Sequence, residues 1–459
     1  MTDAGGRLTD DFDPSVIPVG MRPLYGSYGP FVPKKRAAGR SSSVNANAHA
    51  TPSAQSSMSG ATISGVLEYA NFDYSSAPLT GVPGAYVEAF CLGKSNPYGD
   101  LYDLEYHVVT STGAGGSFGV TCEPGYDYIE GQIMLRDSYS HVTGKNGIYA
   151  GSGFAGYDND SFTLRVANDY AARVFLDLRT YVPAIFSKFG RSRSRVSAEV
   201  AANDQYFGIS YCPTTEYGGC GANDVIKTNF TRVFSANAGT FDWVGLFITL
   251  HEYAHSYQFV AVEAWALGAN GCTDGIHDWA ETENLGCGFV EGFANWVSMT
   301  TIGAIVSTSP FGGDHGLENN VYLGSPTNPP SGGDGVRVEA AVAAFLYDLI
   351  DTGSELDGLT NGVGTNETHD SLSVSPGWVL DVIEHCTLRV SSSTTVIKLS
   401  GADELVYCVE NSVAAQAVAS PLLAPSAWRT YLSVGFGQTL PTYNQALIRK
   451  LWKFNFYGV

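Results

Sequence analysis

The chain has 459 residues, of which 44% are hydrophobic and 15% are charged, with 53 glycines. This length favours two or three domains, and the composition is that of a globular protein rich in turns. The formal net charge of -20 argues against nucleic acid or an anionic membrane surface as a partner. No stretch reaches the roughly 18 apolar residues that a membrane-spanning helix needs, so the sequence predicts no membrane span.

Residues 1–60 lack the pattern of a folded domain. Prolines interrupt any helix or strand in the first half, and a Ser/Ala/Asn tract follows the basic run Lys34-Lys35-Arg36. We expect an extended arm or linker here, available to a surface or assembly partner. The first residues show no basic start followed by an apolar run, so no signal peptide is predicted in the printed sequence.

Residues 61–165 are predicted to form an antiparallel β-sandwich. Short β-rich runs alternate with turn signals, at 61–68, 85–91, 106–110, 117–121, 128–135 and 162–166. The segments ISGVLEYANFD, GVPGAYVEAF and VVTSTGAGGSFGVTC resemble the transthyretin-like, carboxypeptidase-regulatory-type sandwich. Such sandwiches often precede the catalytic domains of secreted enzymes, so the resemblance implies a fold and a docking role rather than a reaction.

The eight cysteines include no C-x-x-C pair, which argues against a thiolate zinc site. We predict disulfides between neighbours in sequence, because each such couple stays within one predicted domain. The couples are Cys91 with Cys122, Cys212 with Cys220, Cys272 with Cys287, and Cys386 with Cys408. Free buried thiols are the alternative. Disulfides would indicate an oxidising compartment and therefore an extracellular or cell-surface location.

Residues 166–459 are predicted to form a mainly helical α+β domain of the zincin type, with a helical C-terminal part. A helix over 166–186 precedes strands at 197–202, 207–211 and 224–228. Further helices are predicted at 242–266, 288–296, 336–351 and 378–385.

The helix at 242–266 contains the sequence His251-Glu252-Tyr253-Ala254-His255. Residues i and i+4 lie on one face of a helix, so both imidazoles can reach a single metal ion. Glu252 lies about 100° further around the helix, where it can act as the base for a zinc-activated water. The alternative is a pair of core histidines beside a buried glutamate.

A catalytic zinc site uses three protein ligands, and Glu291 is the best candidate for the third. It is the one carboxylate in the apolar helix at 288–296, where burial is costly unless the group is paired or ligating. Asn295 follows four residues later on the same face and could hold the second nitrogen of a ligating histidine. A surface or helix-pairing glutamate is the alternative for Glu291.

His251, Glu252, His255 and the run Glu291-Gly292-Phe293-Ala294-Asn295 resemble the gluzincin metallopeptidases, over roughly residues 166–350. The resemblance implies that His251, His255 and Glu291 bind Zn²⁺ and that Glu252 is the catalytic base. Asn295 departs from the aspartate that many gluzincins have there. The longer pattern HExxHxxGxxH is excluded, because Gln258 and Ala261 replace its glycine and third histidine.

The helix at 336–351 supplies two further candidates. The segment AAFLYDLID resembles a helix that follows the zinc helices in secreted peptidases, where Tyr347 could stabilise the oxyanion. A core aromatic is the alternative for Tyr347. Oxygen ligands for Ca²⁺ could come from Asp348, Asp351 and Asp357, which otherwise are solvated acids at a helix end.

These features together predict an extracellular zinc metalloendopeptidase acting on protein or peptide substrates. Two alternatives stay open. One is a structural or adhesive surface protein with a catalytically silent metallopeptidase-like domain. The other is a zinc hydrolase that acts on a non-peptide amide or on glycosylated protein.

Overall fold

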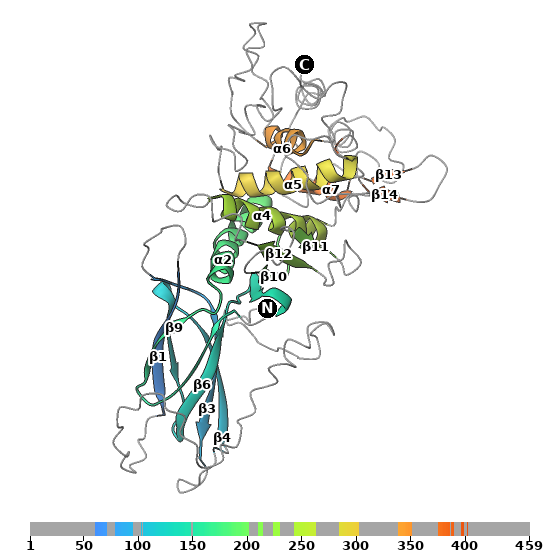
Figure 1. Ribbon diagram of the computed structural model, residues 1–459. Coiled ribbons are helices and arrows are strands. Elements are labelled where there is room, and N and C mark those ends of the chain that lie inside the picture. Colours follow the sequence, from blue (N-terminus) through green and yellow to red (C-terminus); the bar gives the residue numbers. More distant parts are fainter. Residues whose placement is uncertain are drawn as a thin grey trace.

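The computed structural model describes residues 60–70, 79–94, 102, 104–147, 150–201, 210–213, 224–229, 243–262, 284–302, 338–350, 375–385, 387–389, 396–398 and 402. Sheets make up the N-terminal part of this range and helices dominate the later part, a multidomain-like arrangement (Figure 1). The predicted arm lies outside the described residues, except for Gly60.

Two four-stranded sheets form the N-terminal part. The first has the order β2-β1-β5, with β9 also paired to β1; its strands are β1 (Thr62–Ala70), β2 (Leu79–Gly81), β5 (Ser117–Thr121) and β9 (Ser161–Arg165). The second has the order β4-β3-β6-β8, with β3 (Tyr86–Gly93), β4 (Leu104–Ser111), β6 (Tyr126–Met134) and β8 (Ser152–Tyr157). A short 3-10 helix, η3 (Ala114–Gly116), precedes β5.

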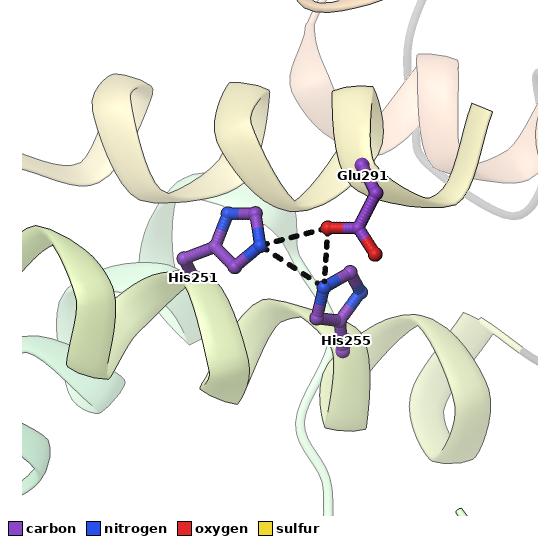
Figure 2. A group of neighbouring side chains, drawn as sticks. All are labelled: His251, His255 and Glu291. Atoms are coloured by element: carbon purple, nitrogen blue, oxygen red, sulfur yellow. Dashed lines mark hydrogen bonds and ion pairs between the residues drawn. The ribbon is translucent and has the colours of Figure 1, made fainter. Parts of the chain in front are cut away.

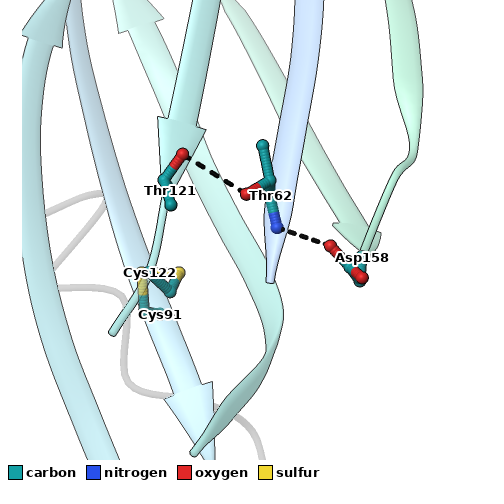
Figure 3. The surroundings of a disulfide bond; sticks show 5 residues. All are labelled: Thr62, Cys91, Thr121, Cys122 and Asp158. Carbon is teal, nitrogen blue, oxygen red and sulfur yellow. Dashed lines mark hydrogen bonds between the residues drawn. A yellow bond between two sulfur atoms is a disulfide. The ribbon is translucent and has the colours of Figure 1, made fainter. Parts of the chain in front are cut away.

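Aromatic rings and a disulfide join these two sheets. The ring of Phe118 on β5 lies 5.3 Å from that of Phe154 on β8, a contact that crosses from one sheet to the other. Cys91 on β3 is bonded to Cys122, which directly follows β5 (Figure 3). The predicted Cys91–Cys122 disulfide is therefore confirmed. Beside it, Thr62 on β1 donates its backbone N–H to Asp158, over 2.8 Å.

The strand pairing differs from the prediction in one respect. β9 runs parallel to β1, so the first sheet is mixed and the expectation of a purely antiparallel arrangement is wrong there. The sequence pattern also missed β2, β7 (Ser140–Gly144) and β8, because these strands are short, polar or rich in glycine and lack clear alternation. The transthyretin-like sandwich itself stays a prediction.

A second region of sheet lies beneath the helices. Its order is β11-β12-β10-β7, with β10 (Val196–Ala201), β11 (Ser210–Cys212) and β12 (Val225–Asn229). The strands β7, β10 and β12 are parallel, whereas β11 is antiparallel to β12. β7 belongs to this sheet although its residues fall inside the range predicted for the sandwich, and a 3-10 turn, η4 (Lys145–Gly147), follows it.

The helix α2 (Asp169–Phe189) connects the two regions. Asn168 caps its first turn by accepting a hydrogen bond from the backbone N–H of Ala171, and Gly190 ends it with a φ of 71°. Its apolar stripe is buried, including Phe175 and Leu178. The helix starts three residues later than predicted because its cap is at Asn168, not within the preceding strand.

Three apolar helices are stacked above this sheet (Figure 1). They are α4 (Trp243–Tyr257), which continues as the π-helical turn η5 (Gln258–Val262), α5 (Leu285–Ile302) and α6 (Glu339–Asp348), with α5 between the other two. Every residue of α5 from Gly286 to Thr300 is buried. Helices that are apolar on all sides belong in a core. None of the helices in the described part of the chain is both long and apolar enough to cross a membrane.

The described C-terminal elements are short. They are the helix α7 (Pro376–His385) and the strands β13 (Thr387–Arg389) and β14 (Val396–Lys398). The two strands pair with each other in antiparallel orientation. Cys212 and Cys287 are disulfide-bonded, and their predicted partners, Cys220 and Cys272, lie outside the described residues. The predicted couple Cys386 and Cys408 also lies outside them.

His141 on β7 gives the fold a predictable response to acid. Burial of its imidazole lowers the pKa to about 3, and the nearby charges of Arg136 and Arg195 act in the same direction. Below the ordinary pKa of 6.5, the unfolded chain therefore binds a proton that the folded chain does not. The free energy of unfolding should fall by roughly 1.4 kcal/mol per pH unit from this group as the pH drops from about 6.5 towards 3.

Urea unfolding of the wild type and of His141→Asn, at about pH 7 and about pH 5, tests this expectation. The variant should lose less stability than the wild type on acidification, by about 2 kcal/mol. An equal loss in both proteins would show that His141 does not carry this part of the acid response.

Candidate metal centre

The facing sides of α4 and α5 bring together the candidate metal ligands. On α4, His251 and His255 are one helical turn apart and both rings point towards α5 (Figure 2). Glu291 reaches towards them from α5 (Figure 2). We call these three residues the triad. All three are buried, with exposed fractions of 9% for His251, 4% for His255 and 6% for Glu291.

The three ligand atoms form a small triangle. The Nε2 atom of His251 lies 2.9 Å from Glu291 Oε2, and that of His255 lies 3.0 Å from the same oxygen. The two Nε2 atoms are 3.1 Å apart. A tetrahedral ion with bonds of about 2.0–2.1 Å separates its ligands by about 3.3 Å, so the observed spacing fits a small divalent ion closely.

The donor types fit the same interpretation. Two imidazole nitrogens and one carboxylate oxygen are a ligand set of catalytic zinc sites. The three atoms converge on one point, and a cation there would satisfy all of them together. Within the described residues, the triad is the one group of three or more His, Cys, Asp or Glu side chains whose ligand atoms lie close enough to hold a metal ion.

The environment keeps the Glu291 side chain in its ligating form. Burial alone would raise the pKa of this carboxyl group, but the charge of His255 and the hydrogen bonds from both histidines lower it further than burial raises it. The net result is a pKa well below the usual range, so Glu291 is an anion.

The outer contacts of the triad extend through α5 to α6. Asn295 Oδ1 lies 2.7 Å from Nδ1 of His251, and its outer role at a metal site stays a prediction. The amide Nδ2 of Asn295 donates to Oε2 of Glu339 over 3.2 Å. Glu339 was not a predicted site residue, although a buried acid at the start of an apolar helix is the same signal that identified Glu291.

The remaining predicted site residues lie on α4, on α6 or outside the described residues. Glu252 is on α4 next to His251 and is 6% exposed. Tyr347 is on α6 and packs, partly buried, against the apolar core. Tyr347 is eight residues from Glu339, or about 12 Å along the helix. Its role at the oxyanion stays a prediction. Asp348 is buried on α6, whereas Asp351 and Asp357 of the suggested Ca²⁺ site lie outside the described residues.

An ion pair that no sequence pattern indicated ties α4 to the sheet. Arg193, whose side chain is fully buried, binds both carboxylate oxygens of Asp224 at 2.6 and 3.1 Å. Arg193 also donates to the hydroxyl of Ser256, the residue after His255. The same carboxylate accepts a hydrogen bond of 2.8 Å from the Tyr211 hydroxyl on β11. Burial of the Tyr211 hydroxyl raises its pKa, and the charge of Asp224 raises it further.

This ion pair should contribute to stability. Arg193→Met keeps the apolar stem but leaves Asp224 without its cation. Because the Asp224 side chain is 32% exposed, the expected cost is about 2 kcal/mol, below the full cost of a wholly buried pair. Arg165→Met is the matched control, since its pair with Asp169 is exposed and should contribute less than about 1 kcal/mol. Equal midpoints of urea unfolding for the two variants would refute the expectation.

Comparison with known proteins bears on the same helices. No curated protein matches the chain. A family model described as the mycolysin C-terminal domain matches residues 245–375, which is less than half of the chain. That span contains the triad and α6. The part of the chain that carries the candidate metal centre is therefore similar to a metallopeptidase family.

Proposed function

We propose that this chain is an extracellular zinc metalloendopeptidase. The observation that carries the proposal is the convergence of His251, His255 and Glu291 within about 3 Å of one another, between two buried helices. The similarity of residues 245–375 to the mycolysin C-terminal domain supports it independently.

In this proposal the triad binds the metal and Glu252 moves the proton. A Zn²⁺ ion bound by the triad would supply Lewis acidity for polarising the scissile carbonyl. The carboxylate of Glu252 takes a proton from the attacking water and then delivers it to the nitrogen of the leaving amine. Burial of the triad and Glu252 reduces solvent screening, which strengthens every electrostatic interaction with the reacting atoms.

The sheet edge next to α4 is where we place the substrate backbone. Within the described residues, β11 pairs with β12 on one side only, and it contacts α4. An extended peptide bound beside β11 would lie next to the helix that carries His251 and His255. The strands predicted at 207–211 and 224–228 overlap β11 and β12, and the resemblance to gluzincins leaves open which of the two lines a substrate cleft. We choose β11 because it is at the edge of the sheet within the described residues.

The two N-terminal sheets complete the proposal as an accessory, transthyretin-like sandwich. The Cys91–Cys122 disulfide joins them and suits an oxidising compartment. We assign this part a docking role towards a surface or assembly partner, and the chemistry to the helical part. An extracellular location follows from the same disulfide chemistry.

A cleavage assay on the purified full chain tests the proposal. An unstructured protein substrate should be cut internally, cutting should stop when a zinc chelator is added, and added Zn²⁺ should restore it. Cleavage that persists after the metal has been removed would refute the zinc mechanism. Bound zinc without any cleavage would favour the silent surface protein, and cleavage confined to non-peptide amides or glycosylated protein would favour the other hydrolase.

A further inference from the structure

The contact between Asn295 and Glu339 connects the triad to a third helix. Glu339 is 3% exposed and lies in the first turn of α6, and Asn295 is 2% exposed on α5. A buried carboxylate is costly unless hydrogen bonds and charge offset its lost hydration. Here the amide of Asn295 and the positive end of the α6 dipole both favour it.

The chemistry of this contact fixes the direction of the hydrogen bonds. A carboxylate can only accept hydrogen bonds, so Asn295 must turn its NH₂ group towards Glu339. Its carbonyl oxygen then faces Nδ1 of His251, at 2.7 Å. A carbonyl oxygen can only accept, so Nδ1 of His251 must carry a hydrogen. In the neutral ring Nε2 then has a lone pair, which a metal ion would take in place of the contact with Glu291.

The opposite orientation of Asn295 would have the opposite result. An NH₂ group presented to His251 would favour an unprotonated Nδ1 and a protonated Nε2, which cannot bind a metal. An asparagine by itself does not select between these orientations, because its oxygen and nitrogen ends occupy nearly the same shape. An aspartate at this position would have no such ambiguity, because both of its oxygens are acceptors.

Close packing between the helices holds the two partners in place. A Cβ atom on Gly292 would lie 2.7 Å from the backbone oxygen of Glu339 and 2.6 Å from Cβ of Val342. Gly292 directly follows the ligand Glu291, so the first turn of α6 is seated against the metal-binding turn of α5.

We propose that Glu339 is a positioning residue of the metal centre: by orienting Asn295, it selects the tautomer of His251 that can bind the ion. This inference rests on the proposed function and adds to it. With an asparagine at position 295, the negative charge is supplied by Glu339 on α6, which contacts Asn295 and through it His251.

Zinc affinities of four variants, measured by competition with a zinc-binding dye, test this inference. Glu339→Leu removes the acceptor and should weaken zinc binding about 10-fold. Glu339→Gln can still accept from Asn295 through its carbonyl oxygen and should lose less than Glu339→Leu. Asn295→Asp alone should weaken binding, because it places two buried carboxylates side by side. The double variant Asn295→Asp, Glu339→Gln restores one donor and one acceptor and should recover affinity close to that of the wild type.

Leu346→Ala is the matched control, because it removes a buried apolar side chain of α6 two turns from Glu339 without touching the hydrogen bonds. It should lower the thermal midpoint but leave the zinc affinity unchanged. Two results would overturn the inference: a loss of affinity in Leu346→Ala as large as that in Glu339→Leu, or a double variant that binds no better than Asn295→Asp. A wild-type chain that binds zinc but cleaves no peptide would refute the peptidase while leaving these affinities as the test of Glu339.

Discussion

Glu252→Gln is expected to lower kcat/KM for peptide cleavage by about 10²–10⁴-fold, the usual contribution of a general base. Glutamine has nearly the same shape as glutamate but cannot take a proton from water. The zinc content should not change, because Glu252 does not belong to the three residues whose ligand atoms converge. Steady-state kinetics on an internally quenched peptide, together with metal analysis of the same samples, measure both quantities.

The control for this prediction is Glu105→Gln, an identical change at an exposed residue of β4. It should leave the rate and the zinc content at the wild-type level. Full activity in the Glu252 variant would remove this residue from the mechanism. Loss of zinc along with activity would instead make Glu252 part of the metal-binding structure.

Glu291→Ala is expected to remove the metal from the centre and to abolish cleavage. The change deletes one of three ligands and leaves two neutral imidazoles to hold a dication. The zinc dissociation constant should rise by more than about 100-fold, beyond the 10–100-fold that the loss of an outer partner costs. Titration of zinc into the metal-free variant, followed with a competing dye, measures the change.

Asn295→Ala provides the comparison, because it removes an outer partner and keeps all three ligands. Its loss of zinc affinity should be clearly smaller than that of Glu291→Ala. If the two variants bind zinc equally well, then Glu291 is not a ligand, and the third ligand would have to be sought elsewhere in the chain.

The parts of the structure that follow from local sequence pattern were predictable. The apolar periodicity at 242–266 and 288–296 indicated the helices that are α4 and α5, and the acid within an apolar helix drew attention to Glu291. The ends of the elements were less predictable. The helix predicted at 242–266 was expected to continue as an α-helix beyond residue 257. In the structure α4 ends there, and the chain continues as a π-helical turn.

The parts that depend on distant contacts were not predictable. Arg193 and Asp224 are 31 residues apart, and Asn295 and Glu339 are 44 residues apart, so no local pattern relates them. The parallel pairing of β9 with β1 is of the same kind, because the sequence of one strand does not reveal its neighbour's direction. β7 was missed for a further reason: it is short, and it joins a sheet made of residues from the next part of the chain.

The most direct test of the metal centre is the zinc stoichiometry of the purified full-length chain, after exposure to excess Zn²⁺ and removal of the unbound ion. Two imidazoles and one carboxylate that meet between α4 and α5 should retain one zinc ion per chain. A chain that is correctly folded and retains no zinc would contradict the account.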